Sequence, residues 1–122
     1  MSAAEHLGTY AEGWTKGDAA AILKATVADY TFDDPNAGRI SRSAFTSYLN
    51  GLKETVAACS GGKLPDPFMK LSEVVTQEAD GVLTAWCWWE VPGTEIKGSG
   101  LIKVTPTGVR SEVITYYAKV AG

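Results

Sequence analysis

The chain has few of the residues that metal or nucleic-acid sites require. Its 122 residues include one histidine and two cysteines. Cys59 and Cys87 lie in unlike surroundings, which predicts two free thiols and provides no zinc-binding pattern. The 14 acidic residues outnumber the 11 basic ones, and the basic ones form no cluster of the kind that binds a phosphate backbone. Glycine-rich phosphate-binding motifs are absent as well. We therefore expect no metal, no cofactor and no nucleic acid as a partner.

Long apolar runs are absent too. No run approaches the roughly 20 residues that cross a bilayer, and the first residues lack the charged and apolar regions of a signal peptide. The content of 45% apolar and 20% charged residues is ordinary for a globular protein, and a chain of this length fits one core. We expect a single domain over residues 1–122, located in the cytoplasm and without a membrane partner.

The first half of the chain has the periodicity of helices. Apolar residues recur at helical spacing up to Lys16, Gly17 is typical of a helix end, and Asp18 is typical of the cap of a second helix over residues 19 to about 27. Ser41 is in a position to cap a third helix. The apolar stripe of that helix comprises Phe45, Tyr48, Leu49, Leu52 and Val56.

The second half is predicted to be β-sheet. Turn residues at Asp80 and Gly81, at Pro92 and Gly93, and at 106–108 divide it into long runs. Long runs joined by tight turns predict an antiparallel meander. The runs are 68–79, 82–91, 94–105 and 109–119. Three N-terminal helices followed by such strands indicate an α+β domain, in which the helices pack on a curved, mainly antiparallel sheet and enclose a cone.

Alternation along the strands predicts which side chains face the helices. We assign the more apolar set of each strand to that face, which leaves Glu90 and Glu112 on the opposite face, in solvent. The inward set comprises Leu83, Ala85, Cys87, Trp89 and Val91, then Ile96, Gly98, Gly100, Ile102 and Val104, and finally Val113, Thr115 and Tyr117. The outer face still carries Trp86 and Trp88, and large aromatic residues there predict a homodimer packed through the sheet.

Asp34 ends a short predicted strand that Pro35 stops. By alternation it shares a face with Tyr30 and Phe32. A carboxyl group among aromatic rings is either a reactive group, because burial disfavours its charged form, or a turn residue that binds nearby backbone N–H groups. Tyr10 and Tyr48 lie on helical apolar stripes, so each is either a core residue or part of the same site.

The order of elements resembles the nuclear-transport-factor-2-like (NTF2-like) superfamily, over nearly the whole chain. Residues 10–18 (YAEGWTKGD) and 28–35 (ADYTFDDP) look most like the bacterial ketosteroid isomerases, and the SnoaL-like proteins are similar here. Residues 48–52 fall where the isomerases keep a tyrosine. The resemblance implies a cone-shaped fold and proton transfer on a hydrophobic carbonyl compound, of isomerase or cyclase type.

The resemblance also implies roles for individual residues. Asp34 would be the general base, Tyr10 would donate a hydrogen bond to the enolate oxygen, and Tyr48 would support Tyr10. The isomerases carry a second donor, a protonated aspartic acid, where this chain has Gly100. The walls around a flat ligand would comprise Trp14, Phe32, Cys87, Trp89, Gly100, Ile102, Val113, Thr115 and Tyr117.

Other members of the superfamily fit less well. SnoaL-type cyclases resemble this fold but use an acidic residue on a later strand, and alternation predicts no inward carboxylate there. Limonene-epoxide-hydrolase-like members need an Asp–Arg–Asp set, whereas Arg110 is expected to face outward. Two alternatives to an enzyme stay open: a module that binds a planar hydrophobic molecule without catalysis, and a docking surface for another protein at Trp86 and Trp88.

Overall fold

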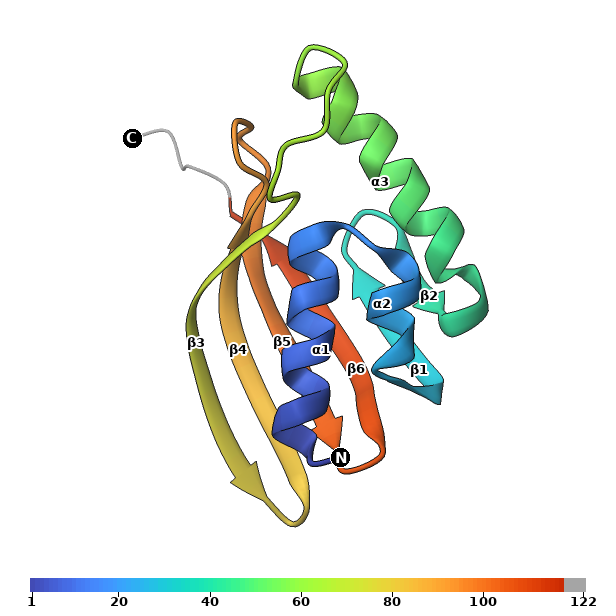
Figure 1. Cartoon of the computed structure of the whole chain (residues 1–122), viewed down its shortest axis with the longest axis vertical. Coiled ribbons are helices and arrows are strands. Elements are labelled where there is room, and N and C mark those ends of the chain that lie inside the picture. The colour runs from blue at the N-terminus through green and yellow to red at the C-terminus, as the bar shows by residue number, and fades with distance from the viewer. Residues whose placement is uncertain (118–122) are drawn as a thin grey trace.

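A computed structural model describes residues 1–117 of the chain (Figure 1). Its elements are α1 (Ala3–Lys16), α2 (Ala19–Lys24), β1 (Thr26–Asp34), β2 (Gly38–Ser41), a 3-10 turn (Arg42–Ala44), α3 (Phe45–Cys59), β3 (Lys70–Ala79), β4 (Val82–Glu90), β5 (Lys97–Thr105) and β6 (Gly108–Tyr116). One sheet contains six strands in the order β2-β1-β6-β5-β4-β3. Strands β3 to β6 form the predicted antiparallel meander, and β1 joins it by pairing parallel to β6. The α+β prediction is confirmed.

The ends of the first two helices follow from local capping chemistry. Ser2 and Glu5 form a capping box at the start of α1, and Gly17 ends it with φ of 67°, a conformation that favours glycine. The side chain of Asp18 accepts the N–H of Ala21 at the start of α2. These ends agree with the prediction. Helix α2 stops earlier than residue 27, however, because the chain there enters β1 and pairs with β6.

The segment between Asp34 and the third helix differs from the prediction. Residues 38–41 form the edge strand β2, which pairs antiparallel to β1, whereas the sequence predicted no strand here and only a helix cap at Ser41. Ser41 makes no capping hydrogen bond, and α3 begins after the 3-10 turn. The predicted stripe is nevertheless correct where it matters for packing, since Phe45, Leu49 and Val56 are fully buried.

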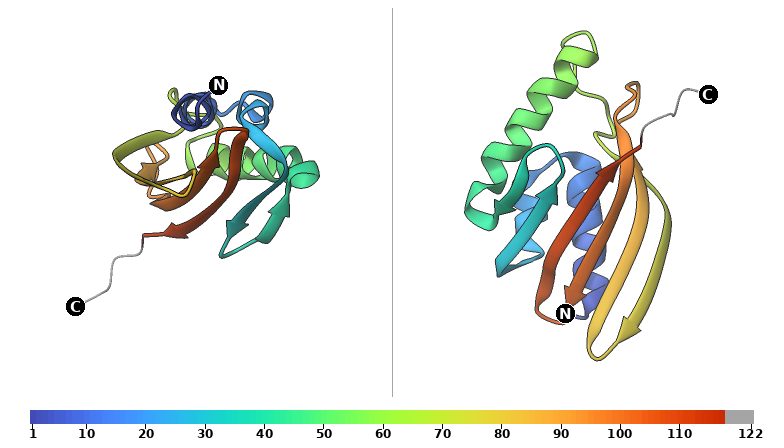
Figure 2. Two further views of the ribbon diagram at one scale, coloured as in Figure 1. Left: turned by 90° about the horizontal axis from the view of Figure 1, so that it is seen from below. Right: turned by 180° about the vertical axis from the view of Figure 1, so that it is seen from behind.

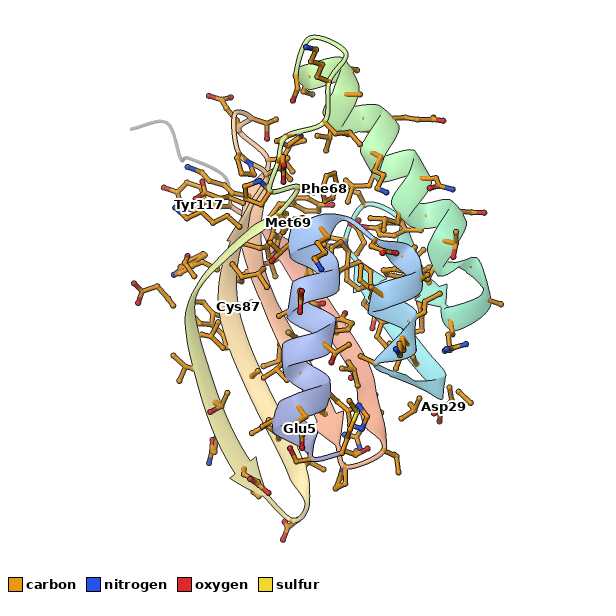
Figure 3. The ribbon with its side chains drawn as sticks, in the orientation of Figure 1. Glu5, Asp29, Phe68, Met69, Cys87 and Tyr117 are labelled. Atoms are coloured by element: carbon orange, nitrogen blue, oxygen red, sulfur yellow. The ribbon has the colours of Figure 1, made fainter. Side chains whose placement is uncertain are left out.

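Helices α1 and α2 lie on one face of the sheet, and the view from behind shows the strands in front of them (Figure 2). The chain that follows α3 returns across the end of α1, where the N–H of Phe68 donates to the carbonyl of Thr15 at 2.8 Å. Phe68 and Met69 enter the core at this point (Figure 3). Within residues 1–117, none of the helices combines the length and the apolar character needed to cross a membrane.

The predicted alternation is correct for β4 and β5. The inward residues of β4 are buried from Leu83 to Trp89, and those of β5 are buried from Gly98 to Val104. Trp88 on the opposite face is 43% exposed, as the alternation requires.

The predicted alternation is wrong for β6. Val113 is 45% exposed and Tyr117 48% exposed, and Thr115 is exposed as well. Glu112 and Ile114 point inward instead. The cause is a β-bulge: Lys103 pairs with Ser111, but the next residue, Val104, pairs with Val109. Arg110 is therefore an extra residue, and it reverses the faces of all positions that follow it in the strand. The predicted run to residue 119 passes the end of β6, and positions 118 and 119 lie outside the described residues.

Candidate functional site

Two carboxyl groups are buried in the described part of the chain, and tyrosines hold both. Asp34 at the end of β1 and Glu112 on β6 are each 5% exposed. Three further buried or half-buried groups, Tyr10, Tyr48 and Tyr116, bind them. The carboxyl groups come from parallel neighbouring strands, so the topology of the sheet brings them into the same interior.

The first cluster is built around Glu112. The hydroxyl of Tyr10 on α1 donates to Glu112 Oε1 at 2.5 Å, and it lies 2.6 Å from the hydroxyl of Tyr30 on β1. Burial raises the pKa of Glu112 to about 7, and the hydrogen bond from Tyr10 limits this rise. The carboxyl group therefore changes its charge near neutral pH, the range in which a side chain can both accept and donate a proton.

Gly100 provides the space that Glu112 fills. A Cβ atom at Gly100 would lie 2.3 Å from Glu112 Oε2, which is far inside van der Waals contact. Across the described residues, no hydrogen bond from the protein reaches this second oxygen. A carboxyl group thus occupies the region next to the position where the resemblance expected a carboxyl group on β5, but it comes from the neighbouring strand.

The second cluster is built around Asp34. Asp34 Oδ2 accepts the hydroxyls of Tyr48 at 2.5 Å and Tyr116 at 2.8 Å, and Oδ1 accepts the N–H of Asn36 at 2.8 Å. Burial, and then the hydrogen bond to Asp34, raise the pKa of Tyr116 to about 12 and that of Tyr48 further. Both phenols therefore stay protonated and act as donors at neutral pH.

A small cavity connects the two clusters. Centres of water-sized molecules occupy about 30 Å³ in it, so a ligand larger than a few waters requires its walls to move apart. Asp34 is not among the residues that line the cavity. The lining comprises Tyr10, Trp14, Phe32, Tyr48, Leu52, Met69, Leu71, Cys87, Trp89, Val91, Ile96, Ile102, Glu112, Ile114 and Tyr116.

Most of the predicted site residues converge on this cavity. Those that line it are Tyr10, Trp14, Phe32, Tyr48, Cys87, Trp89 and Ile102, and Gly100 lies beside Glu112. Val113, Thr115 and Tyr117 do not line it, because the bulge turns them to the outer face; Figure 3 shows Tyr117 away from the helices.

The predicted pairing of site residues is also wrong. Asp34 was expected opposite Tyr10, with Tyr48 supporting Tyr10. Tyr10 binds Glu112 and Tyr30 instead, whereas Tyr48 binds Asp34.

Sequence reasoning missed Glu112 and Tyr116 for one shared reason, the bulge that precedes them. The prediction that β6 carries no inward carboxylate, which weighed against a cyclase-like site, is therefore wrong. The sequence did offer one signal that β6 places large side chains inward, namely the two inward glycines Gly98 and Gly100 on β5. Small residues at those positions leave space for larger side chains on the neighbouring strand.

The chain matches no protein-family model and no curated protein, but it is similar to solved structures. A "putative polyketide cyclase" from Xanthomonas campestris pv. campestris has a TM-score of 0.63 and 17% identity, covering 94% of this chain and 90% of that one. A "putative ketosteroid isomerase" from Parabacteroides distasonis has a TM-score of 0.67 and 13% identity, covering 94% and 87%. An NTF2-like protein from Anabaena variabilis has a TM-score of 0.64 and 13% identity, covering 96% and 87%. The chain has the NTF2-like fold.

Similarity at these low identities establishes the NTF2-like fold and leaves the activity to be argued from the site. The solved NTF2-like structures include a protein of unknown function from Cytophaga hutchinsonii, with a TM-score of 0.62 and 14% identity over 96% of this chain and 91% of that one. The fold by itself therefore assigns no activity to the chain.

Proposed function

We propose that this NTF2-like protein transfers a proton on a small carbonyl compound bound in the cavity, and that Glu112 takes up and returns this proton. The observation that supports the proposal most directly is the free oxygen Oε2 of a buried carboxyl group that lines an otherwise largely apolar cavity. A carboxylate in such surroundings is a stronger base than one in water.

The geometry favours Glu112 over Asp34 for this role. Asp34 accepts hydrogen bonds on both oxygens and does not line the cavity. Its contribution is to position Tyr48 and Tyr116, which do line it. Tyr10 similarly fixes Oε1 of Glu112 and leaves Oε2 directed elsewhere. The proposal therefore replaces Asp34, the base that the resemblance implied, by Glu112.

The reaction conserves all atoms. Glu112 Oε2 takes a proton from the carbon next to the carbonyl group, and the bonding electrons move onto the carbonyl oxygen to form an enolate. The protonated carboxyl group then returns the proton to the same carbon, which gives exchange, or to a more distant carbon of a conjugated enolate, which gives isomerisation. A carboxyl group that titrates near neutral pH can perform both steps.

A suitable assay is the conversion of β,γ-unsaturated cyclohexenone into its conjugated isomer, followed by ultraviolet absorption. We expect Glu112→Gln to lower the rate by roughly 10²–10⁴-fold. The wild-type rate should rise with pH and level off above about 7, because the carboxylate is the active form. Glu90→Gln, which changes an exposed glutamate on β4, is the matched control. Equal rates for Glu112→Gln and wild type would refute the proposal.

A ligand carrier without catalysis is the second candidate. The observation in its favour is the composition of the cavity wall, in which apolar and aromatic side chains predominate. In this case Glu112→Gln would bind conjugated cyclohexenone as well as wild type does, and neither protein would accelerate the isomerisation above the buffer rate.

We also propose that a second copy of the chain covers the outer face of the sheet. An apolar row crosses this face in register, from Val75 through Trp86 and Leu101 to Val113, and Trp88 adjoins it. Such a row can pack against its own copy about a twofold axis. Sedimentation velocity should show a dimer that Leu101→Lys dissociates. A wild-type monomer would refute self-association and leave the face open to a different protein.

A further inference from the structure

Two tryptophans in the cavity wall carry buried indole N–H groups without an acceptor. Trp14 on α1 is 6% exposed and Trp89 on β4 is 7% exposed. Neither Nε1 atom has a hydrogen-bond partner in the described structure, and both residues line the cavity. Native proteins rarely leave a buried donor unpaired, because each such group loses its hydration without compensation. Two residues that line one cavity thus each have an indole N–H group for which the described protein provides no acceptor.

Other aromatic rings pack against both indoles. The ring of Trp14 lies 5.5 Å from that of Phe32 and 5.6 Å from that of Phe45, between centroids. The ring of Trp89 packs edge-on against Tyr116 with centroids 5.5 Å apart. Aromatic pairs prefer edge-to-face and offset arrangements, so such contacts favour particular tilts of a ring. The neighbouring rings therefore favour the orientation in which each indole is observed.

The other strong donors of the cavity are already in use. The hydroxyl of Tyr10 donates to Glu112, and those of Tyr48 and Tyr116 donate to Asp34. An incoming oxygen atom that needs a neutral donor therefore finds one at the indoles of Trp14 and Trp89.

We infer that the indole N–H groups of Trp14 and Trp89 bind the carbonyl oxygen of the ligand. The ligand class that follows is a compact apolar molecule with hydrogen-bond acceptors and few donors of its own, such as a ketone, an ester or a quinone. The inference rests on the proposed function for the site and extends it. The same N–H groups stabilise the enolate oxygen when Glu112 removes the proton, since fixed donors act most strongly on developing charge in a dry site.

The test compares two probes of the same shape, conjugated cyclohexenone and cyclohexene, which lacks the oxygen. Calorimetric titration should show that Trp14→Phe and Trp89→Phe each weaken binding of the ketone on the order of tenfold and leave binding of the hydrocarbon unchanged. Trp86→Phe, which alters an indole on the outer face, is the matched control and should leave both affinities unchanged. If the two inner variants bind the ketone as wild type does, the inference is overturned.

A spectrum of the wild-type protein provides a test that does not depend on the folding of any variant. The chain has four tryptophans, so a proton–nitrogen correlation spectrum contains four indole signals. Saturation with the ketone should move those of Trp14 and Trp89 downfield, as a new acceptor does, and cyclohexene should not. Movement of one signal alone supports that residue and overturns the assignment of the other. Identical spectra with both probes, which indicate that the indoles bind water only, overturn the inference.

These outcomes are separate from those of the isomerisation assay. Ketone-dependent indole shifts without catalysis would retain the carbonyl-binding role and refute the proposed reaction. Catalysis that depends on Glu112, combined with unmoved indole signals, would retain the reaction and refute the role of the two tryptophans.

Discussion

Replacement of Glu112 by glutamine should change how the stability of the protein depends on pH. Glutamine keeps the shape of the side chain and an oxygen that can accept the hydroxyl of Tyr10, but it cannot ionise. Wild type must bury a charge at high pH, whereas Glu112→Gln never does. We therefore expect the variant to gain stability relative to wild type as the pH rises.

The magnitude follows from the pKa of Glu112, which burial raises from 4.5 to about 7. A folded-state pKa above the unfolded one means that the native protein binds more protons between these values, so the free energy of unfolding falls as pH rises through this window. The stabilisation is fully present below pH 4.5 and is lost by pH 7 to 8. The total change corresponds to about 3 kcal/mol.

Urea denaturation of both proteins at several pH values from 4.5 to 8 measures this difference. Other titrating groups are common to both proteins and cancel in the comparison. The difference between variant and wild type should move by about 3 kcal/mol in favour of the variant across the window. Glu90→Gln, at an exposed position, should show no such trend. If the two stability curves for Glu112→Gln and wild type run parallel, Glu112 is not a buried titrating group and the proposed base is wrong.

Two further predictions concern the groups that shape the site. Gly100→Ala should destabilise the protein by about 1–3 kcal/mol, because its Cβ would displace Glu112 Oε2. The control Gly51→Ala, on an open helix surface, should stabilise the protein by roughly 0.5–1 kcal/mol. Thermal or urea unfolding measures both changes. Asp34→Asn should lower the free energy of unfolding by about 1–3 kcal/mol, because it weakens two hydrogen bonds from buried phenols. Asp33→Asn, which breaks only an exposed ion pair, should lower it much less. Equal losses of stability in the two variants would show that the Asp34 cluster contributes no particular stability.

Local chemistry made the helical half and much of the meander predictable. Gly17 and Asp18 mark a helix end and a cap by their own conformational preferences, and the structure uses them in these roles. The alternation of β4 is readable because aromatic and small apolar residues occupy one face without interruption. Asp34 was placed on the buried face of β1 for the same reason, and the structure agrees.

The errors arose where contacts distant in sequence decide the conformation. The N–H of Val109 donates to the carbonyl of Ala25 at 2.7 Å, which anchors the start of β6 on the chain that leads into β1. Val109 pairs with Val104 of β5, but the next pair joins Ser111 to Lys103, so Arg110 is left as an unpaired bulge residue. Neither constraint is visible in the residues of β6 themselves. Strand β2 was missed in a similar way, because pairing with β1, and not the four residues of the segment themselves, makes it a strand.

The extra residue at Arg110 makes the interior of this protein unusually sensitive to chain length. A substitution in β6 alters one side chain, but the loss of a single codon at this hairpin would rotate the rest of the strand by half a turn. Glu112 and Tyr116 would then exchange places with aliphatic and hydroxylated neighbours that now meet solvent. Each carboxyl–phenol cluster would lose a member in the same event. One deletion is therefore enough to remove the carboxyl group of Glu112 from the interior, and one insertion at the same place is enough to return it.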